Sequence, residues 1–263
     1  MRKFKMQSSE QDKLLIAKVA DKINISKTQN KVTNSYFLNE YQINMIERQL
    51  QKAKQDQYFF FGGYEEALRK ILLVYPDKLE KDTVIANIND LITAIKIELP
   101  NEIKGELKHK DYLGTLMSFG FARERVGDII VYDNRAYIIV LKENAEYIKT
   151  SFEQERKFKK AKIEIVNLSK IEPKPIEYDN INISVNSLRL DNIISEILKT
   201  SRKIAQEYLE QEKVYINYSE ETKSTKTIKE KDVLVIRGKG KYIVESFLGK
   251  NKKRQRSNTN KKI

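Results

Sequence analysis

Arg202 and Lys203 are two cations in the first turn of a predicted helix, within the stretch TSRKIAQEYLEQEKVYIN that begins at Thr200. The N-terminal end of a helix carries free N–H groups and a partial positive charge, so a cation there is disfavoured by about 0.3–1 kcal/mol. The same N–H groups attract a phosphate, which an arginine can bind through two parallel hydrogen bonds. The pattern therefore predicts a phosphate receptor, with Ser201 as N-cap residue and Gln206 on the exposed face.

Other polar residues could extend this site along a folded RNA, which proteins recognise mainly by its shape and backbone. They are Arg189, Lys213, Asn217, Lys223, Arg237 and Lys239. The alternative is an ordinary solvated helix start, in which the two cations pair with Asp191 or Glu196.

A second stretch, GELKHKDYLG, holds the chain's single histidine, His109, close to Asp111. A His–Asp pair could activate a nucleophile or bind a metal. The spacing is not diagnostic, and no nucleophile elbow, phosphate-binding loop or histidine pair accompanies it. We therefore expect a helix that begins near His109 with Asp111 in its first turn, and neither a catalytic residue nor a metal or other cofactor. Arg123, Arg125 and Lys110 could make a second RNA contact, with a structural role as the alternative.

The formal net charge is +13 over 263 residues, which favours a polyanionic partner, although a Lys-, Asn- and Ile-rich composition can also arise from genome bias. The excess is uneven: residues 1–82 carry 15 cations and 11 acids, residues 83–186 carry 16 of each, and residues 187–263 carry 19 and 10. Seven of the last group of cations lie in residues 249–263, which contain no acid.

The composition also limits the protein's class. A 40% hydrophobic content can form an ordinary core, and the absence of cysteine excludes disulfides and thiolate metal sites. No apolar run approaches the ~18 residues that span a bilayer, and the N-terminus lacks the features of a signal peptide. We expect a cytoplasmic protein that does not bind membranes.

The chain is predicted to be an α+β protein that begins with a small, mainly helical domain over residues 1–82. Apolar spacing predicts helices over 10–24 and 39–57, then a strand at Tyr58–Phe61 and a helix at Glu65–Val74. The four adjacent aromatics could stack on bases, but no cations are interleaved with them, so core packing is favoured.

Residues 83–170 are predicted to form a ferredoxin-like β-α-β-β-α-β domain, the arrangement found in RNA-recognition motifs. The predicted elements are a strand at 91–99, a helix at 109–119, a hairpin with strands at 129–132 and 136–141, a helix at 143–153 and a strand at 162–167. Tyr137 is the sole candidate for base stacking in the central strand, so RNA binding through this sheet remains a hypothesis.

Residues 171–186 are predicted to be a linker, 187–248 a C-terminal module, and 249–263 a disordered basic tail that could become ordered on a polyanion. The module has two helices, with Ile204, Ala205, Tyr208 and Leu209 predicted on the buried stripe of the second. A strand KVYIN, a polar excursion and two strands around the Gly238–Gly240 turn follow.

This module resembles the alpha-L, or S-four-type, RNA-binding domain. The family pattern of an R-L-D helix, an S-R helix, a V-x-V-N strand and a D-x-[IV]-x-V-R strand is matched by RLDN, TSRK, VYIN and DVLVIR in the same order. Two departures from the family pattern matter for the geometry of the site. The chain has Glu212 where the family usually has glycine, and Asn217-Tyr218 where it usually has Asn-Gly, so the turn geometry around Lys213 is a specific question for the structure.

The segments FGGYEEA and GELKHKDYLGTLMSFGFARERVGDIIV, combined with such a module, resemble the YlmH family of bacterial RNA-binding proteins over residues 35–248. The resemblance implies a helical N-terminal part, an RRM-like middle and an S-four-type end. It also implies binding to ribosomal RNA and tRNA on the large ribosomal subunit, peptidyl-tRNA among them, in the rescue of stalled translation. An RNA-modifying enzyme, such as a pseudouridine synthase or methyltransferase, or a ribosome assembly factor remains an alternative; the oligomeric state is not indicated.

Overall fold

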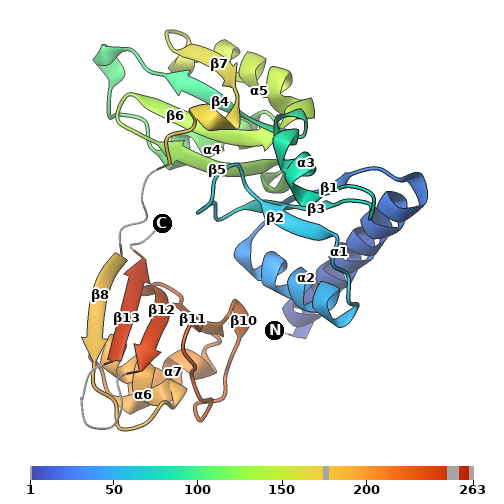
Figure 1. Ribbon diagram of the computed structural model, residues 1–263. Coiled ribbons are helices and arrows are strands. Elements are labelled where there is room, and N and C mark those ends of the chain that lie inside the picture. The colour runs from blue at the N-terminus through green and yellow to red at the C-terminus, as the bar shows by residue number, and fades with distance from the viewer. Residues whose placement is uncertain (1, 174–177, 248–254, 261–263) are drawn as a thin grey trace. The chain divides into compact units, whose positions relative to one another are not determined.

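The structure of the protein is a computed structural model that describes residues 2–173, 178–247 and 255–260 (Figure 1). The chain divides into two compact units, Met1–Lys174 and Pro175–Ile263. The described strands form three sheets, and neighbouring strands in each are antiparallel. Helices and antiparallel sheets together confirm the predicted α+β class.

The N-terminal part of the first unit is a three-stranded sheet with helices. Its elements are α1 (Arg2–Gln29), β1 (Thr33–Leu38), α2 (Glu40–Lys52), β2 (Tyr58–Phe61), β3 (Lys70–Val74) and α3 (Lys81–Ala86), and the strand order is β1-β3-β2. Asn39 begins α2 through a capping box with Gln42, in which each side chain accepts the backbone N–H of the other residue. Among the described helices, none combines the length and the apolar character that crossing a membrane requires.

The helix predicted over Glu65–Val74 is wrong, because residues 70–74 form the central strand β3. Ile71, Leu72, Leu73 and Val74 are each at most 1% exposed. A strand covered on both faces appears in sequence as a continuous apolar run, and periodicity alone does not separate such a run from a buried helix.

The middle part of the first unit has the predicted β-α-β-β-α-β order. Its elements are β4 (Ile92–Glu98), α4 (His109–Ser118), β5 (Val126–Val131), β6 (Arg135–Leu141), α5 (Lys142–Gln154) and β7 (Lys162–Val166). The strand order β5-β6-β4-β7 places the first and third strands in the middle, as in the split βαβ arrangement. Single 3-10 turns join these elements: η1 (Ile88–Asp90), η2 (Asn101–Ile103), η3 (Arg123–Arg125), η4 (Arg156–Phe158) and η5 (Leu168–Lys170).

This middle sheet is covered on both faces. One core lies between the sheet and helices α4 and α5, and includes Ile95 and Phe152. A second core joins the opposite face to the N-terminal sheet, and brings Tyr137 together with Phe37 and Ile71. Tyr137 is only 1% exposed. The hypothesis that Tyr137 stacks on a base is therefore wrong, because the N-terminal sheet covers its side of the domain.

A buried carboxylate also joins these two parts of the first unit. Asp128 in β5 accepts hydrogen bonds from the Tyr64 hydroxyl at 2.9 Å and from the N–H groups of Leu68 at 2.7 Å and Arg69 at 3.1 Å. Arg69 in turn donates from its guanidinium to the carbonyl of Phe37 at 3.0 Å. Burial raises the pKa of Asp128 above its ordinary value. The stretches FGGYEEALR and RERVGDIIV, distant in sequence, thus form one polar network.

The second unit is a single sheet with two helices. Its elements are β8 (Tyr178–Ile183), α6 (Leu190–Ile197), α7 (Arg202–Glu210), β9 (Val214–Ile216), β10 (Ser219–Glu220), β11 (Val233–Ile236), β12 (Gly240–Phe247) and β13 (Gln255–Asn260). The strand order is β10-β9-β11-β12-β13-β8. Its core lies between the helix pair and the inward face of the sheet, with Ile194 and Leu209 packed against Val214, Leu234 and Val244.

The predicted linker and tail both contribute strands to this sheet. Residues 178–183 of the predicted linker form β8, and residues 255–260 of the predicted disordered tail form β13 between β8 and β12. The segment QRSNTN has no apolar residue. Hydrophobic alternation therefore cannot reveal it, and its pairing rests on backbone hydrogen bonds. The rest of the predicted tail, 249–254 and 261–263, lies outside the described residues.

Candidate nucleic-acid interface

Helices α6 and α7 form the foundation of the candidate site. Leu190, Ile193 and Ile194 of α6 are at most 2% exposed, and Ala205 and Leu209 of α7 are at most 1% exposed. The prediction that Ile204 belongs to the buried stripe of α7 is wrong, since this side chain is 42% exposed. Ala205 and Leu209, four residues apart, define the line of contact with the core. Ile204 lies a hundred degrees or so around the helix from Ala205, in the open first turn.

The start of α7 has the features of the predicted phosphate receptor. The Ser201 hydroxyl accepts the N–H of Ile204 at 3.3 Å, which confirms Ser201 as the N-cap residue. The N–H groups of Arg202 and Lys203 are left without an intrahelical acceptor. The side chains of Arg202, Lys203 and Gln206 are all exposed. Two cations, two backbone donors and an amide are thus available to a ligand at one helix end.

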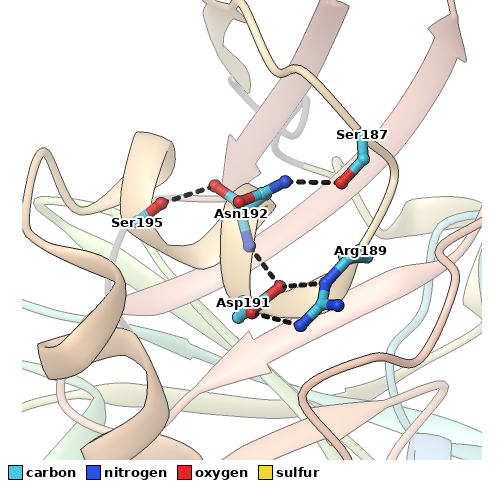
Figure 2. A network of polar contacts seen from close by, with 5 residues as sticks. All are labelled: Ser187, Arg189, Asp191, Asn192 and Ser195. Atoms are coloured by element: carbon cyan, nitrogen blue, oxygen red, sulfur yellow. Dashed lines mark hydrogen bonds and ion pairs between the residues drawn. The ribbon is translucent and has the colours of Figure 1, made fainter.

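Asp191 and Glu196 were the alternative partners for these cations, but the carboxylate of Asp191 is bound by Arg189 (Figure 2). The guanidinium of Arg189 donates to both carboxylate oxygens, at 3.0 and 2.8 Å, and the N–H of Asn192 donates to Oδ1 at 2.9 Å. Asp191 is 2% exposed, and these bonds, that of Arg189 first, hold its pKa below its ordinary value. The charge of Arg202 lowers this pKa further. Within the described residues, however, neither Arg202 nor Lys203 forms an ion pair.

Unlike Arg202 and Lys203, Arg189 is therefore held by a carboxylate of the fold. It is the residue before α6, and its planar guanidinium fixes the buried carboxylate in the first turn of that helix. Figure 2 shows the adjoining bonds from Asn192 to Ser187 and from Ser195 to Asn192, which tie the chain before α6 to the helix. Its first role is to shape the helix pair that carries the site.

The turn after α7 retains a standard helix ending despite the departure at Glu212. The N–H of Glu212 donates to the Leu209 carbonyl and the N–H of Lys213 to the Tyr208 carbonyl, both at 3.0 Å. These two bonds define a Schellman motif, in which glycine is the usual residue at the left-handed position. Glu212 occupies it with φ of 55°. The geometry that places Lys213 is thus the ordinary one, with a glutamate under backbone strain.

The second departure also preserves its turn. Asn217 and Tyr218 link β9 to β10 with φ of 49° and 63°, the two positive values of a type I′ hairpin. The Asn217 amide donates to Asp232 and accepts the N–H of Val233, both at 2.9 Å. Asn217 was predicted to bind RNA, yet these bonds place its side chain in the junction between β9 and β11.

Among the described residues of the second unit, three cations lie over tyrosine rings. Arg237 lies 5.0 Å from the ring centre of Tyr215, Lys241 lies 5.2 Å from that of Tyr218, and Lys213 lies 5.7 Å from that of Tyr208. Such contacts attract the cation to the face of the ring and restrict its motion. Arg237 and Lys213 are distant in sequence but are joined by a backbone hydrogen bond, in which the Arg237 N–H donates to the Lys213 carbonyl at 2.9 Å.

Lys241 is an addition to the predicted set. It lies on β12, where Tyr242 and Val244 point into the core, so strand alternation could have placed it outward. The remaining predicted residues, Lys223 and Lys239, are exposed in loops. The backbone N–H of Lys223 donates to the carboxylate of Glu221. Lys239 lies in the turn between β11 and β12. The structure thus places Arg202, Lys203 and Gln206 on the first turns of one helix, and it places Lys213 beside Arg237.

A pocket of about 260 Å³ lies beside the start of α7. Arg202 forms part of its wall, together with polar side chains that include Asn186, Glu196 and Thr200. The pocket offers hydrogen-bonding groups next to the cation, a combination suited to a polar ligand.

The residues around His109 have the expected structural arrangement. His109 is the first residue of α4, and Asp111 accepts the N–H of Lys108 at 2.9 Å. Burial and then the charge of Arg123 lower the pKa of His109. Arg123 donates to the carbonyls of Val126 at 2.6 Å and Gly127 at 3.0 Å, which holds the turn before β5. Among the residues that the structure describes, no three His, Asp or Glu side chains gather as metal ligands.

Comparison with known proteins gives a match for the middle domain. Residues 90–172 match the family described as "Putative RNA-binding domain in YlmH". The matched range runs from just before β4 to just beyond β7, and so covers the whole split βαβ domain.

Two individual proteins are also similar. The "Ribosome-associated protein quality control protein P2" of Bacillus subtilis (strain 168) is 25% identical over 194 residues, which cover 74% of this chain and 73% of the relative. The solved structure of "Cell division protein ylmH from Streptococcus pneumoniae" shares its fold with a TM-score of 0.50 and 16% identity, over 62% of this chain and 95% of that one. The resemblance to the YlmH family is thereby confirmed, and residues 90–172 are the part of the chain that matches the model of its RNA-binding domain.

Proposed function

We propose that the protein is a non-enzymatic RNA-binding factor that acts in the cytoplasm on ribosomal RNA and tRNA of the large ribosomal subunit. Its principal RNA contact is the start of α7, where Arg202, Lys203 and Gln206 meet a structured RNA. The observation that carries this proposal is the exposure of both cations beside free backbone N–H groups, while the neighbouring Asp191 is already bound by Arg189.

The same geometry supports recognition of backbone rather than of base sequence. Phosphate oxygens accept hydrogen bonds from N–H groups and guanidinium groups, and such contacts fix the register of a protein on a nucleic acid. Lys213, Arg237 and Lys241 are held against tyrosine rings and are proposed to continue the contact along the RNA. We also propose that this unit is an S-four-type RNA-binding domain. The support is the order of its motifs and the preserved turns at Glu212 and at Asn217-Tyr218.

The cellular role is proposed from a relative. The Bacillus subtilis protein that matches 74% of this chain is named for ribosome-associated quality control. A factor with two RNA-binding parts suits a task on a large ribonucleoprotein, where contacts are spread over separate RNA elements. We therefore propose a role in rescue or quality control of stalled translation, with peptidyl-tRNA on the large subunit as the target.

The start of α7 can be tested by charge reversal. The Arg202→Glu/Lys203→Glu variant should bind purified large subunits more than about tenfold more weakly and lower the slope of log affinity against log salt by about 2, because two phosphate contacts are lost. The control is Lys226→Glu/Lys229→Glu, an equal charge change at exposed positions of the same unit, which should stay within about threefold of the wild type.

Sucrose-gradient sedimentation of cell extract at low salt tests ribosome association. Recovery of the protein only at the top of the gradient would refute the ribosomal role. Equal affinities for the wild type and the α7 variant would refute the α7 contact. Loss of one modified nucleoside in a deletion strain would instead favour an RNA-modifying enzyme, and accumulation of immature subunits an assembly factor.

A further inference from the structure

The middle domain contains a concentrated positive charge that the start of α7 does not account for. Residues 156–162, with the sequence RKFKKAK, hold five cations and no acid. Residues 83–186 as a whole hold 16 cations and 16 acids, so the rest of the segment has 11 cations and 16 acids. An otherwise acidic stretch of the chain thus has one strongly basic segment, which we call the basic turn (residues 156–162).

The basic turn has a defined backbone. It follows α5, passes through η4 and enters β7 at Lys162. The N–H of Phe158 donates to the Glu155 carbonyl at 2.9 Å, and the N–H of Ala161 donates to the Phe158 carbonyl at 2.8 Å. Phe158 is 0% exposed and packs on Phe152 and Tyr112, with ring centres 4.9 and 5.3 Å away. One buried aromatic therefore anchors a turn whose charged side chains all face outward.

These cations are not neutralised by neighbouring acids. Arg156, Lys157, Lys159, Lys160 and Lys162 are all exposed. Only Lys162 has an ion pair with another residue of the described part of the chain, at 3.0 Å to Glu164. Four like charges in five residues repel one another in the free protein, and an anionic ligand removes that repulsion.

The sheet of the same domain offers no comparable surface. The N-terminal sheet covers one face, where Tyr137 is buried, and α4 and α5 cover the other. Beyond that cover, Lys96 pairs with Glu98 at 2.7 Å and Arg135 pairs with Glu172. An RNA contact of this domain therefore cannot use the faces of its sheet and must lie elsewhere on its surface.

We propose that the basic turn is a second RNA-binding surface, which contacts the phosphate backbone independently of base sequence. This inference rests on the proposed RNA-binding function and adds a site in the other unit. The one aromatic of the turn, Phe158, is buried, so base stacking is excluded there and the lysines and arginine act as donors to phosphate.

The test is charge reversal of three lysines in the full-length protein: Lys157→Glu, Lys159→Glu and Lys160→Glu together. The matched control reverses Lys78, Lys104 and Lys170, which are exposed in the same unit and outside the turn. Binding to purified large subunits, and to protein-free large-subunit ribosomal RNA, is measured over a range of salt concentrations. The variant should bind both at least about tenfold more weakly than the control, with a salt slope lower by about 2–3, since three phosphate contacts are removed.

The outcomes separate this inference from the proposed function. If the wild type binds RNA, the α7 variant does not, and the basic-turn variant equals its control, the second surface is refuted while the function stands. If the wild type binds neither probe, the function itself fails. If the basic-turn variant loses subunit binding but keeps the affinity of the control for free RNA, the turn contacts an acidic ribosomal protein and the RNA assignment is overturned. Because the reversed side chains are exposed, equal melting temperatures for variant and control verify that the fold is intact.

Discussion

Glu212 and Tyr218 are residues in backbone conformations that favour glycine. The chain has only nine glycines, and residues of other types also adopt the left-handed backbone conformation. Lys199 after α6 is a further example, with φ of 49°. The left-handed region costs a residue with a Cβ about 1–2 kcal/mol. Both turns keep their hydrogen bonds nonetheless, so the surrounding structure outweighs the local strain.

Glu212→Gly should therefore stabilise the second unit. Removal of the strain should raise its free energy of unfolding by about 0.5–1 kcal/mol, the part that remains after the greater chain entropy of glycine is subtracted. Urea unfolding followed by tyrosine fluorescence measures the change. Glu210→Gly is the control: Glu210 is the last residue of α7, where glycine should cost up to about 1 kcal/mol. A loss of stability in both variants would show that Glu212 is not strained.

At the scale of elements, two buried carboxyl groups hold neighbouring segments together and have pKa values shifted in opposite directions. Burial raises the pKa of Asp128, which joins β5 to the loop before β3. The Arg189 guanidinium lowers the pKa of Asp191 at the start of α6. A raised pKa contributes stability below the ordinary value of 3.8, and this contribution is lost as pH rises through the folded-state pKa. A lowered pKa contributes stability above 3.8 that is lost as pH falls through the folded-state pKa.

Substitution of each aspartate by asparagine should reveal the opposite directions of the two pKa shifts. As pH falls from 7 towards 3, the stability of the wild type relative to Asp191→Asn should decrease, and that of the wild type relative to Asp128→Asn should increase. Urea unfolding at a series of pH values, with each variant compared with the wild type at the same pH, measures both differences. Differences that change in the same direction would contradict the opposite environments of the two carboxyl groups.

Elements with a clear pattern could be predicted from the sequence, and those without one could not. The hairpin of β5 and β6 follows from two short apolar runs on either side of the Asp133-Asn134 turn, and the N-cap of α7 follows from Ser201 before a helical pattern. β3 was predicted as a helix because a strand buried on both faces loses its alternation. β13 has no apolar residue, so its place depends on strands distant in sequence.

The candidate site shows the same division. Exposure of Arg202, Lys203 and Gln206 follows from their place on the helix, and the structure agrees. The side-chain bonds of Arg189 and Asn217 depend on where Asp191 and Asp232 lie in the folded unit, which residue type and spacing do not specify. The basic turn combines both kinds of information: the charges are plain in the sequence, whereas the buried anchor Phe158 is a property of the packing.

At the scale of the whole molecule, the two units have separate cores. Among the described residues, the core of the second unit is formed by side chains between positions 181 and 247. Residues 175–263 expressed alone should therefore fold, with a dispersed amide NMR spectrum. This fragment should bind large subunits more weakly than the full chain and with a lower salt slope, because two tethered sites bind more tightly than either alone. An unfolded fragment, or one with the affinity of the full chain, would contradict this independence.

The enclosed sheet of the middle domain also bears on how such proteins can diverge. Its strand residues serve two cores, so a substitution there must fit two sets of neighbours at once. The turns between the strands face no such restriction, and charge can be gained or lost there without repacking. New RNA preferences should therefore arise by exchange of turns on a fixed framework. Grafting turns between distant relatives is thus a practical way to change the target of the domain while its fold is kept.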